Sequence, residues 1–128
     1  MSKSLAAAKI GVEKSEQYGM YLTDEDGRTL YMFLADNRSE SSSCYNRCAE
    51  VWPPLLTTGD PEAAANAVNA DMLGTIERRD GTTQVTYNGW PLYYYVKDQG
   101  QGELTGQDVK GFGAEWYLMA PDGNYIHH

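Results

Sequence analysis

Two stretches of the chain carry apolar or aromatic residues on both faces of an extended strand. Residues 27–36 read Gly-Arg-Thr-Leu-Tyr-Met-Phe-Leu-Ala-Asp, and residues 89–98 read Gly-Trp-Pro-Leu-Tyr-Tyr-Tyr-Val-Lys-Asp. Side chains two positions apart share a face of a strand. Tyr31 and Phe33 therefore share one face, and so do Tyr93 and Tyr95. Because the opposite faces are apolar or aromatic too, the pattern predicts two central strands that are covered on both sides.

The two stretches are also copies of one another. Both fit Gly-x-x-Leu-Tyr-x-aromatic-x-x-Asp without a gap, and Tyr31 and Tyr93 are 62 positions apart. A shorter similarity joins residues 21–27 to residues 117–123, which share Tyr, Leu, Asp and Gly. The sequence therefore predicts an internal repeat and a fold of two related halves.

Turn signals separate the remaining apolar segments into short strands. Asp26-Gly27, Asp80-Gly81, Asn88-Gly89 and Asp122-Gly123 are each typical of a tight turn. Besides the two repeat strands, the expected strands cover residues 18–24, 73–78, 83–87, 115–120 and 125–126. About seven short strands favour an all-β antiparallel sandwich or partly open barrel.

Two short helices are expected between the strands. One helical turn over residues 44–50 would end before Pro53-Pro54. A second helix would begin with Asp60 as its N-cap and Pro61 as its first residue, and would fade near Val68. Residues 37–43 and 99–113 are expected to be loops because they are rich in Ser or Gly.

The predicted organisation is a single domain with a lead-in. Residues 1–16 are interpreted as a flexible lead-in or the remnant of a tether, and residues 17–126 as one β-rich domain. The repeat within it covers residues 18–36 and 83–98, plus 115–123. The final His127 and His128 are left out of the fold.

The charge balance narrows the range of partners. The 128 residues include 10 Lys or Arg and 18 Asp or Glu, which gives a net charge of -8. This argues against nucleic acid and against attraction to anionic membranes. No apolar run is long enough for a transmembrane helix, and no signal peptide is visible. Ten Tyr and three Trp against two Phe suit partly wet surfaces and binding platforms.

The combined motifs resemble a bacterial family of secreted proteins and predicted lipoproteins, named for its Yx(F/W/Y)xxD motif. The similarity extends over residues 18–123. It rests on the two repeat strands and on Cys44-x-x-x-Cys48, Ala49-x-x-Trp52-Pro53-Pro54, Leu73-Gly74-Thr75-Ile76, Asp80-Gly81-Thr82 and Trp116-Tyr117-Leu118. The resemblance implies a location outside the cytoplasm, in the periplasm, on the outer surface or secreted, and often a lipid anchor on an N-terminal Cys. No Cys precedes Tyr18, so we expect a leader that the sequence lacks or a member that is simply secreted.

Cys44 and Cys48 are expected to form a disulfide if the compartment is oxidising. On one helical turn their Cα atoms would be about 6 Å apart, within the usual bridging range. The alternative is a redox pair or a Cu(I) site with soft sulfur ligands. Met20, Met32, Met72 and Met119 keep that alternative open, although none has a ligand spacing near the cysteines.

Asp36 and Asp98 end the two repeat strands, and we expect them to accept backbone N–H bonds in turns. Their alternative role is a carboxylate pair acting on a glycosidic bond. With no internal His there is no Ser-His-Asp or Cys-His arrangement and no ordinary zinc site. We therefore expect no catalytic residue, no metal and no cofactor.

Six aromatic residues are candidates for a binding surface, with the core as the alternative location. They are Trp90, Tyr93, Tyr95, Tyr31, Phe33 and Trp116. The expected function is a non-enzymatic, extracytoplasmic binding or envelope-associated module whose partner is an envelope protein, a glycan or a small ligand. A copper-handling or electron-transfer accessory protein is the first alternative, and a carbohydrate-active enzyme is the second.

Overall fold

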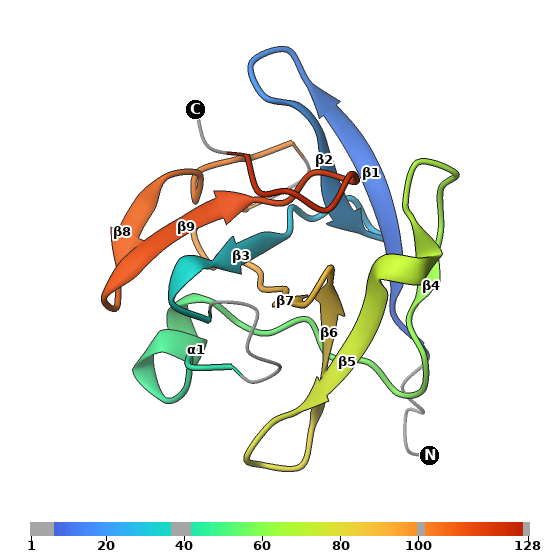
Figure 1. Cartoon of the computed structure of the whole chain (residues 1–128). Coiled ribbons are helices and arrows are strands. Elements are labelled where there is room, and N and C mark those ends of the chain that lie inside the picture. The colour runs from blue at the N-terminus through green and yellow to red at the C-terminus, as the bar shows by residue number, and fades with distance from the viewer. Residues whose placement is uncertain (1–6, 37–41, 100–101, 127–128) are drawn as a thin grey trace.

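The computed structural model describes residues 7–36, 42–99 and 102–126. Over these residues the fold is all-β, as predicted, with nine short strands and one α-helical turn (Figure 1). The strands are β1 (Lys9–Ser15), β2 (Gly19–Asp24), β3 (Tyr31–Phe33), β4 (Glu62–Ala63), β5 (Leu73–Glu77), β6 (Thr83–Tyr87), β7 (Trp90–Pro91), β8 (Val109–Gly111) and β9 (Ala114–Leu118). The helix α1 spans Arg47–Val51, and 3₁₀ turns cover Leu34–Asp36 and Ala70–Met72.

The strands form three sheets of three strands each. Their orders are β2-β1-β4, β3-β9-β8 and β5-β6-β7. All pairs are antiparallel except β1 with β4, which run parallel. Isolated bridges add to these sheets: Tyr31 of β3 pairs with Tyr93, two residues after β7, and Gln84 of β6 pairs with Leu56. The three sheets are therefore linked through the middle of the molecule and do not close into a barrel.

The two repeat strands meet at the centre of the fold. The Tyr31 amide donates to the Tyr93 carbonyl at 2.8 Å, and the Tyr93 amide donates to the Tyr31 carbonyl at 2.9 Å. This is a hydrogen-bonded antiparallel pair. On its other side Tyr31 pairs with Leu118, while Tyr93 pairs with Pro54. The prediction of a central strand is confirmed for the first copy, in which Tyr31, Met32 and Phe33 are all buried. The second copy differs from the prediction: β7 ends at Pro91, Tyr93 forms isolated bridges only, and Val96 is 46% exposed.

Each half of the chain completes the sheet of the other half. The Leu22 amide of the first half donates to the Met119 carbonyl of the second at 2.8 Å. In the same way the Val85 amide of the second half donates to the Leu55 carbonyl of the first at 2.9 Å. The two hairpins are thus each extended by the last segment of the opposite half.

The structure corrects the predicted lead-in at residues 1–16. Residues 9–15 form β1, which pairs with β2 from Ile10 opposite Asp24 to Ser15 opposite Gly19. The reason is the alternation of Ile10 and Val12 with polar neighbours, which gives this strand a buried side. Residues 1–6 lie outside the described residues.

The predicted helix at residues 60–68 is also wrong. Glu62–Ala63 is the strand β4, and the Glu62 and Ala64 amides donate to the carbonyls of Ala8 and Ile10, both at 2.8 Å. Pairing with the open edge of β1 replaces the hydrogen bonds that a helix would supply. The Asp60-Pro61 start signal is local, and the partner that overrides it lies some fifty residues away in the sequence.

Smaller differences occur at three places. The predicted loop over residues 99–113 contains β8, and the predicted strand 125–126 contributes a single bridge between Met119 and Tyr125. The first repeat strand ends in a 3₁₀ turn, so Asp36 belongs to that turn and not to the strand. Of the predicted loop 37–43, residues 37–41 lie outside the described part, as do His127 and His128.

Candidate functional site

Four aromatic rings from both halves form a column through the core. Phe33 stacks on Trp116 with ring centroids 4.0 Å apart, Trp116 stacks on Trp52 at 3.9 Å, and Trp52 stacks on Tyr95 at 4.0 Å. Tyr31 meets Trp52 edge-on at 5.5 Å, and Tyr93 meets Trp116 edge-on at 5.1 Å. The contacts of Tyr31 and Phe33 in the first copy are therefore repeated by Tyr93 and Tyr95 in the second. Each motif segment packs on the tryptophans of both halves.

The Tyr and Asp that both copies of the repeat share bond to each other across the two halves. The Tyr31 hydroxyl donates to Asp98 Oδ2 at 2.7 Å, and the Tyr93 hydroxyl donates to Asp36 Oδ2 at 2.6 Å. Neither tyrosine bonds to the aspartate of its own copy through these oxygens. The motif is therefore a pair of crossed bonds that join the halves.

A second oxygen of each carboxylate is held by the loop that follows. Asp36 Oδ1 accepts from the Ser43 amide at 2.8 Å and the Ser43 hydroxyl at 2.7 Å. Asp98 Oδ1 accepts from the Thr105 amide at 3.0 Å and the Thr105 hydroxyl at 2.5 Å. The hydroxyl residue stands seven positions after the Asp in both copies, a spacing that the sequence analysis did not use. Asp36 and Asp98 are both buried.

Burial changes the acid–base behaviour of these groups. Desolvation raises the pKa of Asp36. The hydrogen bonds from Tyr93 and Ser43 and the nearby Arg78 guanidinium lower the pKa, but by less than desolvation raises it. The pKa values of Tyr31 and Tyr93 are raised well above the ordinary tyrosine value, first by burial and then by the adjoining carboxylates. Both phenols therefore stay protonated as donors over the physiological pH range.

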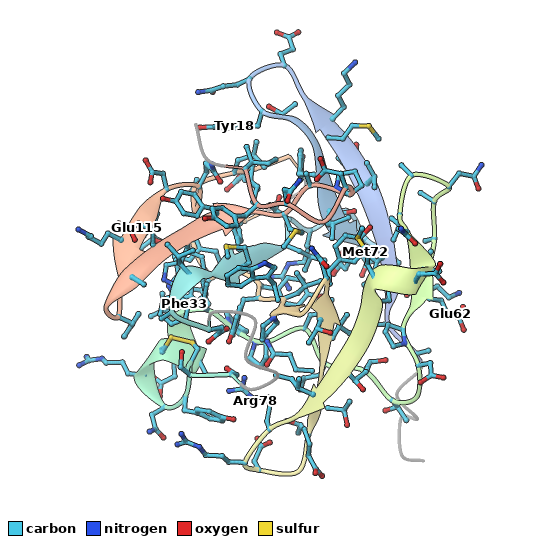
Figure 2. All side chains as sticks on the ribbon, viewed as in Figure 1. Tyr18, Phe33, Glu62, Met72, Arg78 and Glu115 are labelled. Atoms are coloured by element: carbon cyan, nitrogen blue, oxygen red, sulfur yellow. A yellow bond between two sulfur atoms is a disulfide. The ribbon has the colours of Figure 1, made fainter. Side chains whose placement is uncertain are left out.

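The surroundings of the first copy contain the predicted disulfide. Cys44 and Cys48 are bonded, with Cα atoms 5.2 Å apart, beside α1 (Figure 2). The buried Arg78 ties this segment to the second half, because its guanidinium donates to the Cys44 carbonyl at 2.6 Å and to Gln84 Oε1 at 2.8 Å. The disulfide was predicted from the spacing of the cysteines, but the role of Arg78 carried no signal in the sequence.

The second copy has a glycine where the first has Cys44. The Gly106 amide donates to the Tyr31 hydroxyl at 3.0 Å. A Cβ atom at this position would lie 2.8 Å from Tyr31 Cζ, closer than such atoms approach. Backbone contact in the second copy therefore takes the place of the disulfide-bonded loop in the first.

The sulfur atoms do not form a soft metal site in this structure. The cysteine sulfurs are bonded to each other, and Met32 and Met119 are fully buried in the apolar core. Across the residues that the structure describes, no group of three or more His, Cys, Asp or Glu side chains is placed to hold a metal ion. The copper hypothesis gains no support from this geometry.

The structure corrects the expected aromatic binding surface. All six candidates lie in the core with 7% exposure or less: Tyr31, Phe33, Trp90, Tyr93, Tyr95 and Trp116. Aromatic rings from both halves cover these side chains, and alternation along one strand does not reveal such a cover. The six residues build the scaffold and do not contact solvent as a platform.

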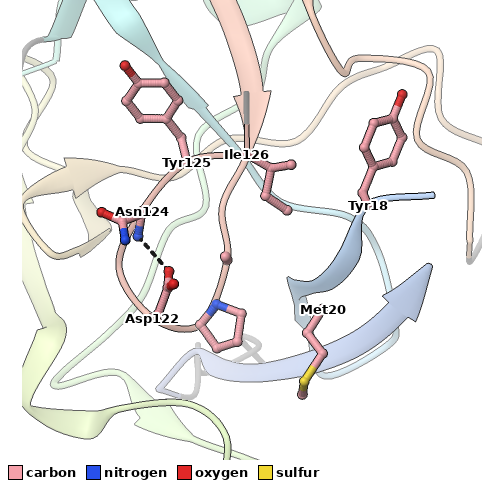
Figure 3. A pocket seen from close by; sticks show the side chains of 8 residues that line it. Tyr18, Met20, Asp122, Asn124, Tyr125 and Ile126 are labelled. Atoms are coloured by element: carbon pink, nitrogen blue, oxygen red, sulfur yellow. Dashed lines mark hydrogen bonds between the residues drawn. The ribbon is translucent and has the colours of Figure 1, made fainter. Parts of the chain in front are cut away.

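A pocket of about 610 Å³ opens on the surface where the start of β2 meets the end of the chain (Figure 3). Tyr18 and Met20 come from the first half, and the other side is formed by the segment from Ala120 to Ile126. The turn in that segment is held by a bond from the Asn124 amide to Asp122 Oδ1 at 3.0 Å. The sequence analysis did not single out this place, although its Asp-Gly turn was predicted.

Comparison with known families identifies the repeat. Residues 14–56 and residues 74–120 each match the family described as a secreted repeat of unknown function. The searches of curated proteins and of solved structures gave no match. Within the described residues, no helix is both long and apolar enough to cross a membrane. The two matches span well over half of the chain, and each contains one Tyr-x-aromatic-x-x-Asp motif, so the chain belongs to this family of secreted repeats.

Proposed function

We propose that the protein is a non-enzymatic binding module that works outside the cytoplasm, in the periplasm, at the cell surface or as a secreted protein. The two repeats form its rigid scaffold, and the recognition surface lies outside the motif strands. Membership in a family of secreted repeats supports the location. The Cys44–Cys48 disulfide supports it too, because such bonds persist in oxidising compartments.

One observation carries the non-enzymatic part of the proposal: both motif carboxylates are committed to structural hydrogen bonds. Each accepts from a tyrosine of the other half and from the amide and hydroxyl of a loop residue. A glycosidase needs two carboxyl groups that face a substrate cleft. Asp36 is only 1% exposed and Asp98 9% exposed. Their bonds account for why the repeat keeps Tyr and Asp at this spacing, without invoking chemistry.

The first experiment measures whether the protein binds envelope material reversibly. Fluorescently labelled full chain is titrated against isolated bacterial envelopes, and bound protein is measured after sedimentation. We expect saturable retention that an excess of unlabelled protein displaces. Retention that does not saturate or is not displaced would argue against a binding module.

A second experiment separates binding from catalysis. Wild type, Asp36→Asn and Asp98→Asn are assayed against a panel of nitrophenyl glycosides, with their unfolding free energies measured in parallel. We expect no hydrolysis by any of the three and a loss of stability in both variants. Hydrolysis by the wild type that disappears in either variant would support the enzyme alternative instead.

A further inference from the structure

The pocket in Figure 3 is partly matched by a second pocket, which is formed by repeat-related positions. We call the first the tyrosine pocket. It is lined by Tyr18, Met20, Ala120, Pro121, Asp122, Asn124, Tyr125 and Ile126. The second, the threonine pocket, has a volume of about 320 Å³ and is lined by Leu56, Thr57, Thr58, Gly59, Gly81, Thr82 and Thr83. Each pocket combines the turn and second strand of a hairpin in one half with the last segment of the other.

The internal repeat relates part of one pocket to part of the other. Met20 corresponds to Thr82, with the same spacing of 62 that relates Tyr31 to Tyr93. On the opposite wall, the spacing of 64 that relates Trp52 to Trp116 also relates residues 56–58 to residues 120–122. Beyond these positions the two walls differ, because the Ile126 amide donates to the Leu118 carbonyl whereas the Glu62 amide donates to the Ala8 carbonyl.

The side chains of the two pockets differ. The threonine pocket carries small hydroxyl side chains, while the tyrosine pocket has a methionine, an isoleucine and two tyrosines. Each pocket also has one large exposed apolar side chain, Met20 at 42% and Leu56 at 39% exposure. The pair of tyrosines is therefore what distinguishes the tyrosine pocket.

The aromatic wall of the tyrosine pocket is held in place before any ligand arrives. The Tyr125 ring stacks on Tyr117 with centroids 5.2 Å apart and meets Trp90 edge-on at 5.8 Å. Tyr18 lies on the other side of Ile126 (Figure 3). Asp122 and Asn124 are exposed at the rim, on the turn that their mutual hydrogen bond fixes. The site thus offers apolar ring surfaces next to a carboxylate and an amide.

This set of groups suits a saccharide. The C–H face of a sugar ring packs on an aromatic side chain, and its hydroxyls bond to carboxylate and amide groups. None of the eight lining residues is basic, and the chain carries a net charge of -8, so an anionic ligand is disfavoured. Half of the lining residues bear polar side-chain atoms, which a purely apolar ligand would remove from water.

We propose that the tyrosine pocket binds a neutral saccharide, with sugar rings against Tyr18 and Tyr125 and hydroxyls toward Asp122 and Asn124. The proposal rests on the binding function proposed above and names its ligand class. The volume of about 610 Å³ falls within the range of small-molecule sites, about 300–1,000 Å³.

The test uses the methionine methyl groups of the full chain as reporters. Protein labelled with ¹³C at the methionine methyls is titrated with maltotriose, mannobiose and diacetylchitobiose and followed by NMR. We expect one of these sugars to shift the Met20 signal in a saturable manner. The signals of Met32 and Met119, which are fully buried in the core, should stay in place and serve as internal references.

Calorimetric titration of variants then locates the site. We expect Met20→Thr, which installs the residue of the threonine pocket, and Asn124→Ala to weaken sugar binding at least tenfold. Thr82→Ala, at the position equivalent to Met20, should leave affinity unchanged. Equal affinity in wild type, Met20→Thr and Asn124→Ala would place the sugar elsewhere and overturn the proposal.

Failure of the ligand assignment is distinguishable from failure of the binding function. The same titrations are run with the neutral peptide acetyl-Leu-Tyr-Leu-amide, alongside the envelope-binding measurement. If the peptide shifts Met20 and the three sugars do not, the saccharide proposal is overturned while a binding module stands. If neither probe shifts Met20, the saccharide proposal falls. The loss of saturable envelope binding as well would remove the proposed function too.

Discussion

The two crossed Tyr–Asp bonds have the same geometry but different surroundings. Around Asp36, the Arg78 side chain and the disulfide-bonded loop close the site, and 1% of the aspartate is exposed. Around Asp98, the Gly106 backbone closes the site, and 9% of the aspartate is exposed. The comparison separates what both halves share from what only one has. The shared tyrosine, carboxylate and hydroxyl loop define the fold, whereas the disulfide and arginine reinforce the first copy.

Removing the motif carboxylate should lower the free energy of unfolding more at Asp36 than at Asp98. Asp36→Ala removes the acceptor of the buried Tyr93 hydroxyl and of both Ser43 donors, at an expected cost of about 3–4 kcal/mol. Asp98→Ala should cost less, about 2–3 kcal/mol, because that site is more exposed. Urea unfolding of both variants measures the difference. A larger loss for Asp98→Ala would reverse the ranking of the two sites.

The glycine that closes the second site provides the next test. Gly106→Ala would place a Cβ 2.8 Å from the Tyr31 ring, and overpacking of this kind costs about 2–3 kcal/mol. Gly111→Ala is the matched control, because a Cβ there meets nothing within 4 Å. Thermal unfolding should show a clear decrease for the first variant and little change for the second. If both variants unfold together with wild type, the close approach at Gly106 does not constrain the core.

Reduction of the disulfide should destabilise only the first copy, and by less than the substitution of Asp36 does. The disulfide closes a loop between residues four positions apart, so its loss is expected to cost about 2 kcal/mol. The double variant Cys44→Ser/Cys48→Ser should unfold at lower urea concentration than wild type, and adding a reductant should not lower it further. Unfolding of wild type that is insensitive to reductant would show that the crossed bonds alone hold this segment.

High pH should weaken both copies equally. The pKa values of Tyr31 and Tyr93 are raised in the folded state, so their contribution is complete below the unfolded value of about 10 and is lost as pH rises above it. In that pH range, each phenol lowers the free energy of unfolding by up to about 1.4 kcal/mol for every unit of pH increase. Tyr31→Phe and Tyr93→Phe should each reduce the slope of unfolding free energy against pH by a similar amount. A reduction in only one variant would mean that the two phenols are not equivalent.

The sequence predicted those features that are encoded locally. Asn88-Gly89 forms the expected turn, with φ of 51° and 85°, and the central strand β3, the strand β6 and the disulfide were also identified. Each of these depends on residues close together in the chain. The repeat itself was visible because its two copies align without a gap.

What the sequence did not reveal is how the copies contact each other. Periodicity treats each strand alone, so it could not tell that Tyr31 bonds to Asp98 and not to Asp36. It also could not tell that the second half covers the aromatic faces, which removed the expected platform. The strand β4 was missed for the same reason, because its partner β1 is distant in sequence. The tyrosine pocket joins both halves, and neither half contains it alone.

The exchange of final segments between the halves determines how this architecture can be shortened or extended. A chain divided between residues 56 and 74 would separate every phenol of the motif from its acceptor and leave each hairpin with an unfilled edge. The smallest unit that satisfies these hydrogen bonds within itself is therefore a pair of copies. In a longer array, copies added two at a time preserve closure, whereas an odd copy leaves one edge open to another chain.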